Sequence, residues 1–363
     1  MNVSLKNNDA VSAILKIEVE KNDYVEQWNK SLRKLRQKAN LPGFRQGMVP
    51  LELIKKMYGR QTLAEEINKL VSERLYSYLK ENRIMILGDP LPNETEQKTI
   101  DFETDETFEF CFDLALSPKV DIQLTKEDQL TYYKVLIDDE MVDKQVDSYR
   151  KSYGSYEKAD EADENETYKE AELNQDFFDR IFGADIVKSE AEFRDKIKES
   201  ILNQYVPETD FRFRKDVRDL LIRKTDALAF ADDILKRWLL MSNEKITKES
   251  IDDDFPKVKN DLKYHLAKEK IVADFEIKVE KGEIESMAKG LARFQFAQYG
   301  AYSGLDDMID NYVKDMMKKQ DTVNNLADRV IEIKVIDCVK ETITVNEQEV
   351  TREEFEKLMK EQE

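Results

Sequence analysis

In the first part of the chain the apolar residues recur at both strand spacing and helix spacing, whereas in the last part they recur almost only at helix spacing. Apolar side chains alternate with polar ones over residues 13–20 and again over 108–116, which indicates two half-buried strands. Between them, residues 24–35 and 63–78 repeat at helical spacing. Strand, two helices and strands in this order predict a compact α+β domain. From Leu173 onward the pattern is almost wholly helical, so the predicted fold class is α+β and mostly helical.

An acidic segment separates these two parts of the chain. Residues 157–172 hold eight acidic residues against two lysines, and Tyr168 is their only large apolar residue. Such a segment cannot bury a core and is expected to be a mobile linker. The expected domains are 1–117, a linker region 118–172, and a helical C-terminal domain 173–363. The first part of the linker region, up to residue 150, reads as extended and then helical and is expected to pack with the C-terminal domain.

Charge is distributed unevenly over the 363 residues. The formal net charge is -19, which argues against a general nucleic-acid binder and against DNA as a partner. Residues 21–60 nevertheless carry ten Lys and Arg against three acids, a local charge of +7 that leaves -26 on the rest. A basic face on an acidic protein favours one localised anionic partner. The alternative is a solvated helix face without a partner.

The sequence shows no catalytic, metal-binding or cofactor-binding pattern. Cys111 and Cys338 are far apart and have no metal-ligand spacing, so both are expected to be reduced thiols in a reducing compartment. His265, the only histidine, is expected to be a packing or surface residue. No phosphate-binding P-loop is present, which argues against ATP-driven cycling. We therefore expect no cofactor, no metal and no catalytic residue.

No run approaches the roughly 18 apolar residues that a membrane-spanning helix requires. Charged residues also interrupt the N-terminus, where a signal peptide would have an apolar core. These observations predict a cytoplasmic, soluble protein without a membrane partner.

The segment Leu41–Pro50 reads LPGFRQGMVP and joins the two predicted helices of the N-terminal domain. Its two glycines permit backbone conformations closed to other residues, and its two prolines stiffen the ends. Between the glycines lie Phe44 and Arg45, a ring and a fixed positive charge suited to docking on an anionic surface. The alternative is an ordinary turn in which Phe44 folds back onto the core.

Gly-Phe-Arg-x-Gly-x-x-Pro in this setting resembles the signature loop of trigger factor, a bacterial chaperone family that docks at the ribosomal exit tunnel. In that family the loop usually reads Phe-Arg-Lys, followed soon by a second Lys. Gln46 and Met48 stand at those positions here, so two positive charges are absent. The resemblance implies a ribosome-binding loop made of Gly43, Phe44, Arg45, Gln46 and Gly47.

The resemblance continues through the C-terminal part. Residues 173–183 resemble the point where the family chain re-enters its C-terminal domain, and residues 345–359 look like the family's last helix. This implies an elongated helical C-terminal domain with arm-like projections. The family carries an inserted peptidyl-prolyl isomerase domain where this chain has only the acidic segment, so the resemblance implies a chaperone without that enzyme activity.

Methionine and aromatic residues of the C-terminal part are the candidate client-binding residues, because flexible, polarizable side chains suit surfaces that accept many partners. They are Met287, Phe294, Phe296, Tyr299, Tyr302, Met308 and Met316. The alternative for each is ordinary helical core.

The function that the resemblance implies is ATP-independent holding of nascent or unfolded polypeptides. The implied partners are the ribosome, through an exit-tunnel protein and rRNA, and those polypeptides. A weak homodimer off the ribosome is left open. Two other functions are also left open: a free-standing holding chaperone that does not bind ribosomes, and a prolyl isomerase.

Overall fold

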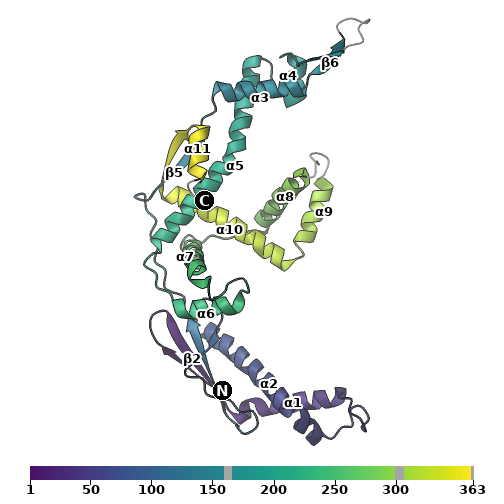
Figure 1. Cartoon of the computed structure of the whole chain (residues 1–363), viewed down its shortest axis with the longest axis vertical. Coiled ribbons are helices and arrows are strands. Elements are labelled where there is room, and N and C mark those ends of the chain that lie inside the picture. The colour runs from purple at the N-terminus through teal and green to yellow at the C-terminus, as the bar shows by residue number, and fades with distance from the viewer. Residues whose placement is uncertain (159–165, 299–305, 361–363) are drawn as a thin grey trace. The chain divides into compact units, whose positions relative to one another are not determined.

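The computed structural model of the chain describes residues 1–158, 166–298 and 306–360 (Figure 1). They form two compact units, of which the first comprises Met1–Val120 and Asp226–Lys263, and the second Asp121–Thr225 and Tyr264–Glu363. The predicted fold class, α+β and mostly helical, is confirmed. The sequence pattern had placed residues 226–263 in the helical C-terminal domain, whereas their contacts place them in the first unit.

The first unit contains a four-stranded antiparallel sheet with the order β1-β2-β4-β3. Its strands are β1 (Asn2–Asn7), β2 (Ser12–Val19), β4 (Phe108–Ala115) and β3 (Leu91–Pro92). The central pair joins β2 to β4 over eight residues, with Ile17 opposite Phe110. These two strands are the ones that the alternating pattern predicted. Helices α1 (Lys21–Lys38) and α2 (Leu51–Glu81) lie between them in the chain.

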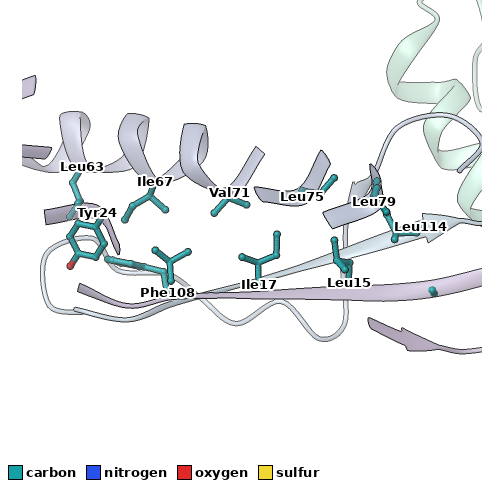
Figure 2. Close-up of a cluster of buried hydrophobic side chains, with 12 residues drawn as sticks. Leu15, Ile17, Tyr24, Leu63, Ile67, Val71, Leu75, Leu79, Phe108 and Leu114 are labelled. Atoms are coloured by element: carbon teal, nitrogen blue, oxygen red, sulfur yellow. The ribbon is translucent and has the colours of Figure 1, made fainter. Parts of the chain in front are cut away.

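The core of this unit lies between α2 and one face of the sheet. Figure 2 shows Leu63, Ile67, Val71, Leu75 and Leu79 pointing from α2 towards side chains of β2 and β4. Their spacing of four residues puts them on one side of the helix. All five are buried, and each buried aliphatic side chain contributes about 1.5–3 kcal/mol. The apolar period therefore fixes which side of α2 faces the sheet.

Helix α6 (Asp232–Ser242) packs on β4 and brings a distant segment into the first unit. Arg237 forms an ion pair of 2.7 Å with Asp113, a buried residue of β4, and Asn93 donates a hydrogen bond of 2.6 Å to the same carboxylate. A buried carboxylate is tolerated only when it is paired and hydrogen-bonded in this way. Helix α7 (Ile251–Asp274) follows and supplies residues to both units.

The second unit is arranged around α5 (Glu190–Lys224), with β5 (Gln129–Val135) and β8 (Thr344–Val350) paired in parallel. Helices α3 (Asp139–Ser152), α4 (Gln175–Phe182) and α11 (Arg352–Lys360) contribute to one core, in which Phe178 stacks on Phe193 at 4.7 Å. The extended-then-helical pattern before residue 151 is confirmed by β5 and α3. The helix predicted from residue 345 is wrong up to residue 350, because backbone pairing with β5 makes that stretch a strand.

Two short strands flank the centre of the acidic segment. β6 (Ser155–Lys158) pairs antiparallel with β7 (Glu166–Lys169), and the pairing was not predicted from the sequence. A strand ladder requires backbone groups rather than apolar side chains, so composition alone did not reveal it. The mobility predicted for this segment falls largely on residues 159–165, which lie outside the described residues.

A second core in this unit joins α8 (Lys281–Gln298), α9 (Asp306–Met316) and α10 (Gln320–Thr342). Its fully buried members include Ala288 and Ala292, whose small side chains allow close approach. Ile309 and Val313, members of the apolar stripe predicted for α9, are buried here too. Over the described ranges, no helix is long and apolar enough to cross a membrane, and no cluster of acidic, His or Cys residues could hold a metal ion.

Candidate functional sites: an exposed loop and two hollows

The connection between α1 and α2 consists of two successive tight turns. The Phe44 amide donates to the Leu41 carbonyl at 3.1 Å, and the Met48 amide donates to the Arg45 carbonyl at 2.9 Å. The third residue of each turn is a glycine with positive φ, +85° at Gly43 and +81° at Gly47. A positive φ at the third position is the requirement of a type II turn. The two glycines therefore allow the chain to turn twice and present the residues between them.

The ends of the loop are anchored while its tip is exposed. Leu32, Val49 and Ile54 form a small buried cluster where the loop meets the two helices. Phe44 is 40% exposed and is not part of this cluster. Arg45 and Gln46 are also exposed. The alternative in which Phe44 folds back onto the core does not describe this structure.

Trp28 and Lys55 brace the two helices below the loop. The Trp28 indole donates a hydrogen bond of 3.1 Å to the Gly59 carbonyl, and the Lys55 ammonium lies 5.1 Å from the centre of the Trp28 ring. Ser31 donates a hydrogen bond of 2.5 Å to Glu66. These contacts hold α1 against α2 and so position the loop on a rigid support.

The positive charge of residues 21–60 is concentrated near this loop. Lys21, Lys30 and Arg60 form ion pairs with Glu106, Glu26 and Glu103. The remaining seven cations form no ion pair in the part of the chain that the structure describes; they are Arg33, Lys34, Arg36, Lys38, Arg45, Lys55 and Lys56. Unpaired cations that lie close together produce a positive potential, which attracts an anionic surface.

The candidate client-binding residues of the C-terminal part occupy different environments. Phe294 is 66% exposed and Met308 is 56% exposed. Phe296 and Met316 are half-buried and pack against the core of α8, α9 and α10. Tyr299 and Tyr302 lie outside the described residues. Phe294 and Met308 thus offer exposed apolar surface to a client, whereas Phe296 and Met316 mainly pack within the protein.

Met287, the remaining candidate, lines two adjoining hollows of the second unit. The first has a volume of about 530 Å³ and is lined by Phe211, Arg214, Lys215, Arg218, Met287, Arg329, Glu332 and Ile333. The second has a volume of about 620 Å³, and its walls come from α8 and α10. Met287 and Ile333 line both. Cavities of this size accommodate peptide side chains or small ligands.

Sequence reasoning missed the lining residues of α5 and α10. The one available signal was the run from Phe211 to Arg218, which has four basic residues against one acid in an acidic chain.

Arg218, the last residue of this run, lies 4.6 Å from the centre of the Tyr264 ring. Burial raises the pKa of the Tyr264 hydroxyl to about 12, and the negative charge of Glu332 adds to this rise. His265 is exposed and 3.2 Å from Glu269, as expected of a surface residue.

Two family models match the chain. The model of the bacterial trigger factor protein matches residues 1–149, and the model of the probable trigger factor C-terminal domain matches residues 209–359. Together they cover 300 of the 363 residues. The chain belongs to the trigger factor family. Neither match includes residues 150–208, and this interval contains the acidic segment at which the family resemblance places an inserted isomerase domain.

Relatives and a solved structure agree with this membership. Trigger factor of Pelagibacter ubique is 24% identical over 156 residues, which is 43% of this chain and 32% of that protein. Trigger factor of Pseudomonas fluorescens is 28% identical over 183 residues, which is 50% of this chain and 40% of that protein. The matched segment thus spans about a third to two fifths of these relatives.

The match in three dimensions is broader. A solved trigger factor chaperone, described in terms of promiscuous substrate recognition in folding and assembly, has a TM-score of 0.58 and 15% identity. The alignment covers 93% of this chain and 99% of that one. At this identity the likeness shows the fold.

Proposed function

We propose that this protein is an ATP-independent chaperone that docks near the ribosomal exit tunnel through its α1–α2 loop and holds unfolded polypeptides on its second unit. The observation that carries the proposal is the exposed Phe44–Arg45 tip, held between two glycine turns on a chain of charge -19. Cations that form no ion pair within the described ranges flank this tip in the sequence. Family membership supports it. The proposed location is the cytoplasm.

Docking would combine a short-range and a longer-range interaction. Arg45 would pair with a phosphate or carboxylate of rRNA or of a protein at the tunnel rim, since a guanidinium matches both geometries. Phe44 would fill a small apolar notch. The neighbouring cations would speed encounter, and their effect would weaken with salt. Gly43, Gln46 and Gly47 complete the proposed ribosome-binding loop.

Client binding would use apolar surface of the second unit. The proposed contacts are Met287, Phe294, Phe296, Tyr299, Tyr302, Met308 and Met316. Each segment held would contribute roughly 25 cal/mol per Å² of buried apolar area. Without ATP, release follows from weak, rapidly exchanging contacts and from folding of the client. A weak homodimer off the ribosome would cover the same kind of surface.

Co-sedimentation with ribosomes tests the docking proposal. Replacing Phe44, Arg45 and Gln46 by Ala should release the protein from ribosomes without unfolding it. A matched control replaces Met57, Arg60 and Gln61 by Ala, because this set also removes an exposed apolar side chain, a cation and an amide, but from α2 rather than from the loop. Normal co-sedimentation of the loop variant would contradict docking through the loop. Client holding without any ribosome binding would favour a free-standing chaperone.

We also infer that the chain lacks the prolyl isomerase activity of the family. An inserted domain needs on the order of 50–200 residues, and two short strands with the segment between them occupy the interval between α3 and α4. So few residues cannot enclose an apolar pocket that desolvates a prolyl amide. A proline-limited refolding reaction should therefore proceed at the same rate with and without the protein. Clear acceleration would contradict the inference.

A further inference from the structure

The lining of the first hollow combines apolar side chains with an excess of positive charge. Phe211 is 48% exposed and Ile333 is 42% exposed, so both present uncovered apolar surface beside the half-buried Met287. Four cations and one acid line the same space. This is a local excess of positive charge on a chain whose net charge is -19.

Two of the four cations are available to a ligand. Arg214 on α5 and Arg329 on α10 are exposed, and neither forms an ion pair within the described ranges. Arg212, two residues before Arg214 in the sequence, differs: it is buried and bonded to Asp216 at 3.2 Å and to the Leu358 carbonyl. Arg212 is therefore bonded within the protein, whereas Arg214 and Arg329 line the hollow as exposed cations.

The second hollow extends the apolar lining but not the excess of positive charge. Leu291, Val330 and the shared Met287 supply apolar lining. Lys334 is paired with Glu283 at 2.7 Å, and Asp337 adds a negative charge. A peptide lying across both hollows would thus meet free guanidinium groups in the first and a mainly apolar surface in the second.

We propose that these hollows select unfolded segments in which acidic residues flank large apolar ones. The proposal rests on the proposed client-holding function and specifies its substrate class. A guanidinium pairs with a carboxylate in a bidentate geometry, whereas the same guanidinium groups would repel a basic segment. The apolar side chains of the segment would cover Phe211, Met287 and Ile333.

The test uses three unstructured peptides with the same apolar residues, in which the flanking residues are Asp and Glu, Ser and Gln, or Lys and Arg. Fluorescence anisotropy with the full chain measures each Kd. We expect the acidic peptide to bind about fivefold more tightly than the neutral one, since exposed charge pairs are individually weak. The preference should shrink as salt is raised.

Variants separate charge selection from client binding. The double variant Arg214→Gln, Arg329→Gln should bring the acidic-to-neutral Kd ratio to about one and leave the neutral peptide's Kd unchanged. The matched control Arg223→Gln, Lys319→Gln removes two exposed cations of the same unit that line neither hollow and should keep the preference. Far-ultraviolet circular dichroism checks that all variants are folded.

The possible results distinguish the two proposals. Equal affinities for the three peptides, or tighter binding of the basic one, would overturn charge selection while leaving client holding intact. Binding of none of them, together with no suppression of aggregation, would overturn client holding and the selection that rests on it. An unstructured oligoribonucleotide that binds more tightly than the acidic peptide and loses affinity in the double variant would overturn the peptide as occupant.

Discussion

Gly88 and Gly43 both have positive φ, +72° and +85°, but their surroundings differ. A Cβ at Gly88 would lie 2.7 Å from the Trp238 ring, and this ring is held by a 3.1 Å hydrogen bond from its indole to Asp89. A Cβ at Gly43 would meet nothing within 4 Å. One position therefore combines backbone strain with a steric clash, and the other has strain alone.

Gly88→Ala should lower the free energy of unfolding of the first unit by about 3 kcal/mol, the sum of backbone strain and overpacking. Gly43→Ala, the matched comparison, should cost only about 1 kcal/mol. Tryptophan fluorescence during urea unfolding measures both, because Trp28 and Trp238 are the only tryptophans and both lie in the first unit. Equal losses would show that the Trp238 contact is unimportant.

Gln46 and Met48 occupy the positions where the family usually carries lysine, and both are exposed. If the loop docks on phosphates, Gln46→Lys with Met48→Lys should tighten ribosome binding and steepen its salt dependence, by roughly one unit of log–log slope for each new lysine that pairs with a phosphate. Binding measured across a salt series gives both quantities. An unchanged affinity and slope would mean that these side chains do not face an anionic surface.

At the scale of elements, Tyr264 of α7 links pH to the packing of the second unit. Its pKa is raised to about 12, mainly by burial, whereas an unfolded tyrosine titrates near 10. The folded state therefore retains the proton to higher pH. The stability contributed by this group is fully present below pH ~10 and is lost as the pH rises towards 12.

Tyr264→Phe should remove the part of the stability loss at high pH that comes from the titration of Tyr264. Because the ring is only half-buried, we expect this part to be about 1 kcal/mol of the free energy of unfolding, rather than the full value that a two-unit pKa shift would give. Urea unfolding of the parent and the variant at pH 8 and near pH 11, followed by circular dichroism, gives the difference. A variant that loses as much stability as the parent would show that Tyr264 does not titrate in this range.

Elements with a clear local period were predictable. The alternation of β2 and β4 and the four-residue repeat of α2 gave the centre of the first unit. β8 was mistaken for helix because its strand conformation comes from pairing with β5, more than 200 residues earlier in the chain. The docking of α6 on β4 depends on Arg237 and Asp113, and no local pattern relates them.

The two kinds of candidate site also differ in how far the sequence predicted them. The glycine, proline, Phe and Arg of the α1–α2 loop are contiguous, so the sequence alone predicted a tight turn at this place. It left open whether Phe44 folds back onto the core, and only the structure shows that Phe44 is exposed. The hollows depend on α5, α8 and α10, and the lining residues of the first hollow alone lie up to 122 positions apart, from Phe211 to Ile333. Helical periods predict that such residues share a face of their own helix, but they do not predict which helices meet.

At the scale of the whole molecule, the two proposed activities use different units. The docking loop belongs to the first unit, and the hollows with Phe294 and Met308 belong to the second. Each unit has its own buried core. Surface changes in one unit should therefore leave the activity of the other intact, because residues that share no partners usually contribute additively.

Phe294→Ser with Met308→Ser should weaken suppression of aggregation of a denatured model protein and leave ribosome co-sedimentation unchanged. The reason is that these two exposed side chains offer apolar area to a client but contribute little to folding, so each change should cost no more than about 0.5 kcal/mol of stability. Light scattering at stoichiometric ratios, without nucleotide, measures the suppression. The matched control Met85→Ser with Tyr76→Ser removes exposed apolar side chains of the first unit and should leave suppression unchanged. If the control weakened suppression as much as the test variant, client binding would depend on total apolar surface rather than on the second unit.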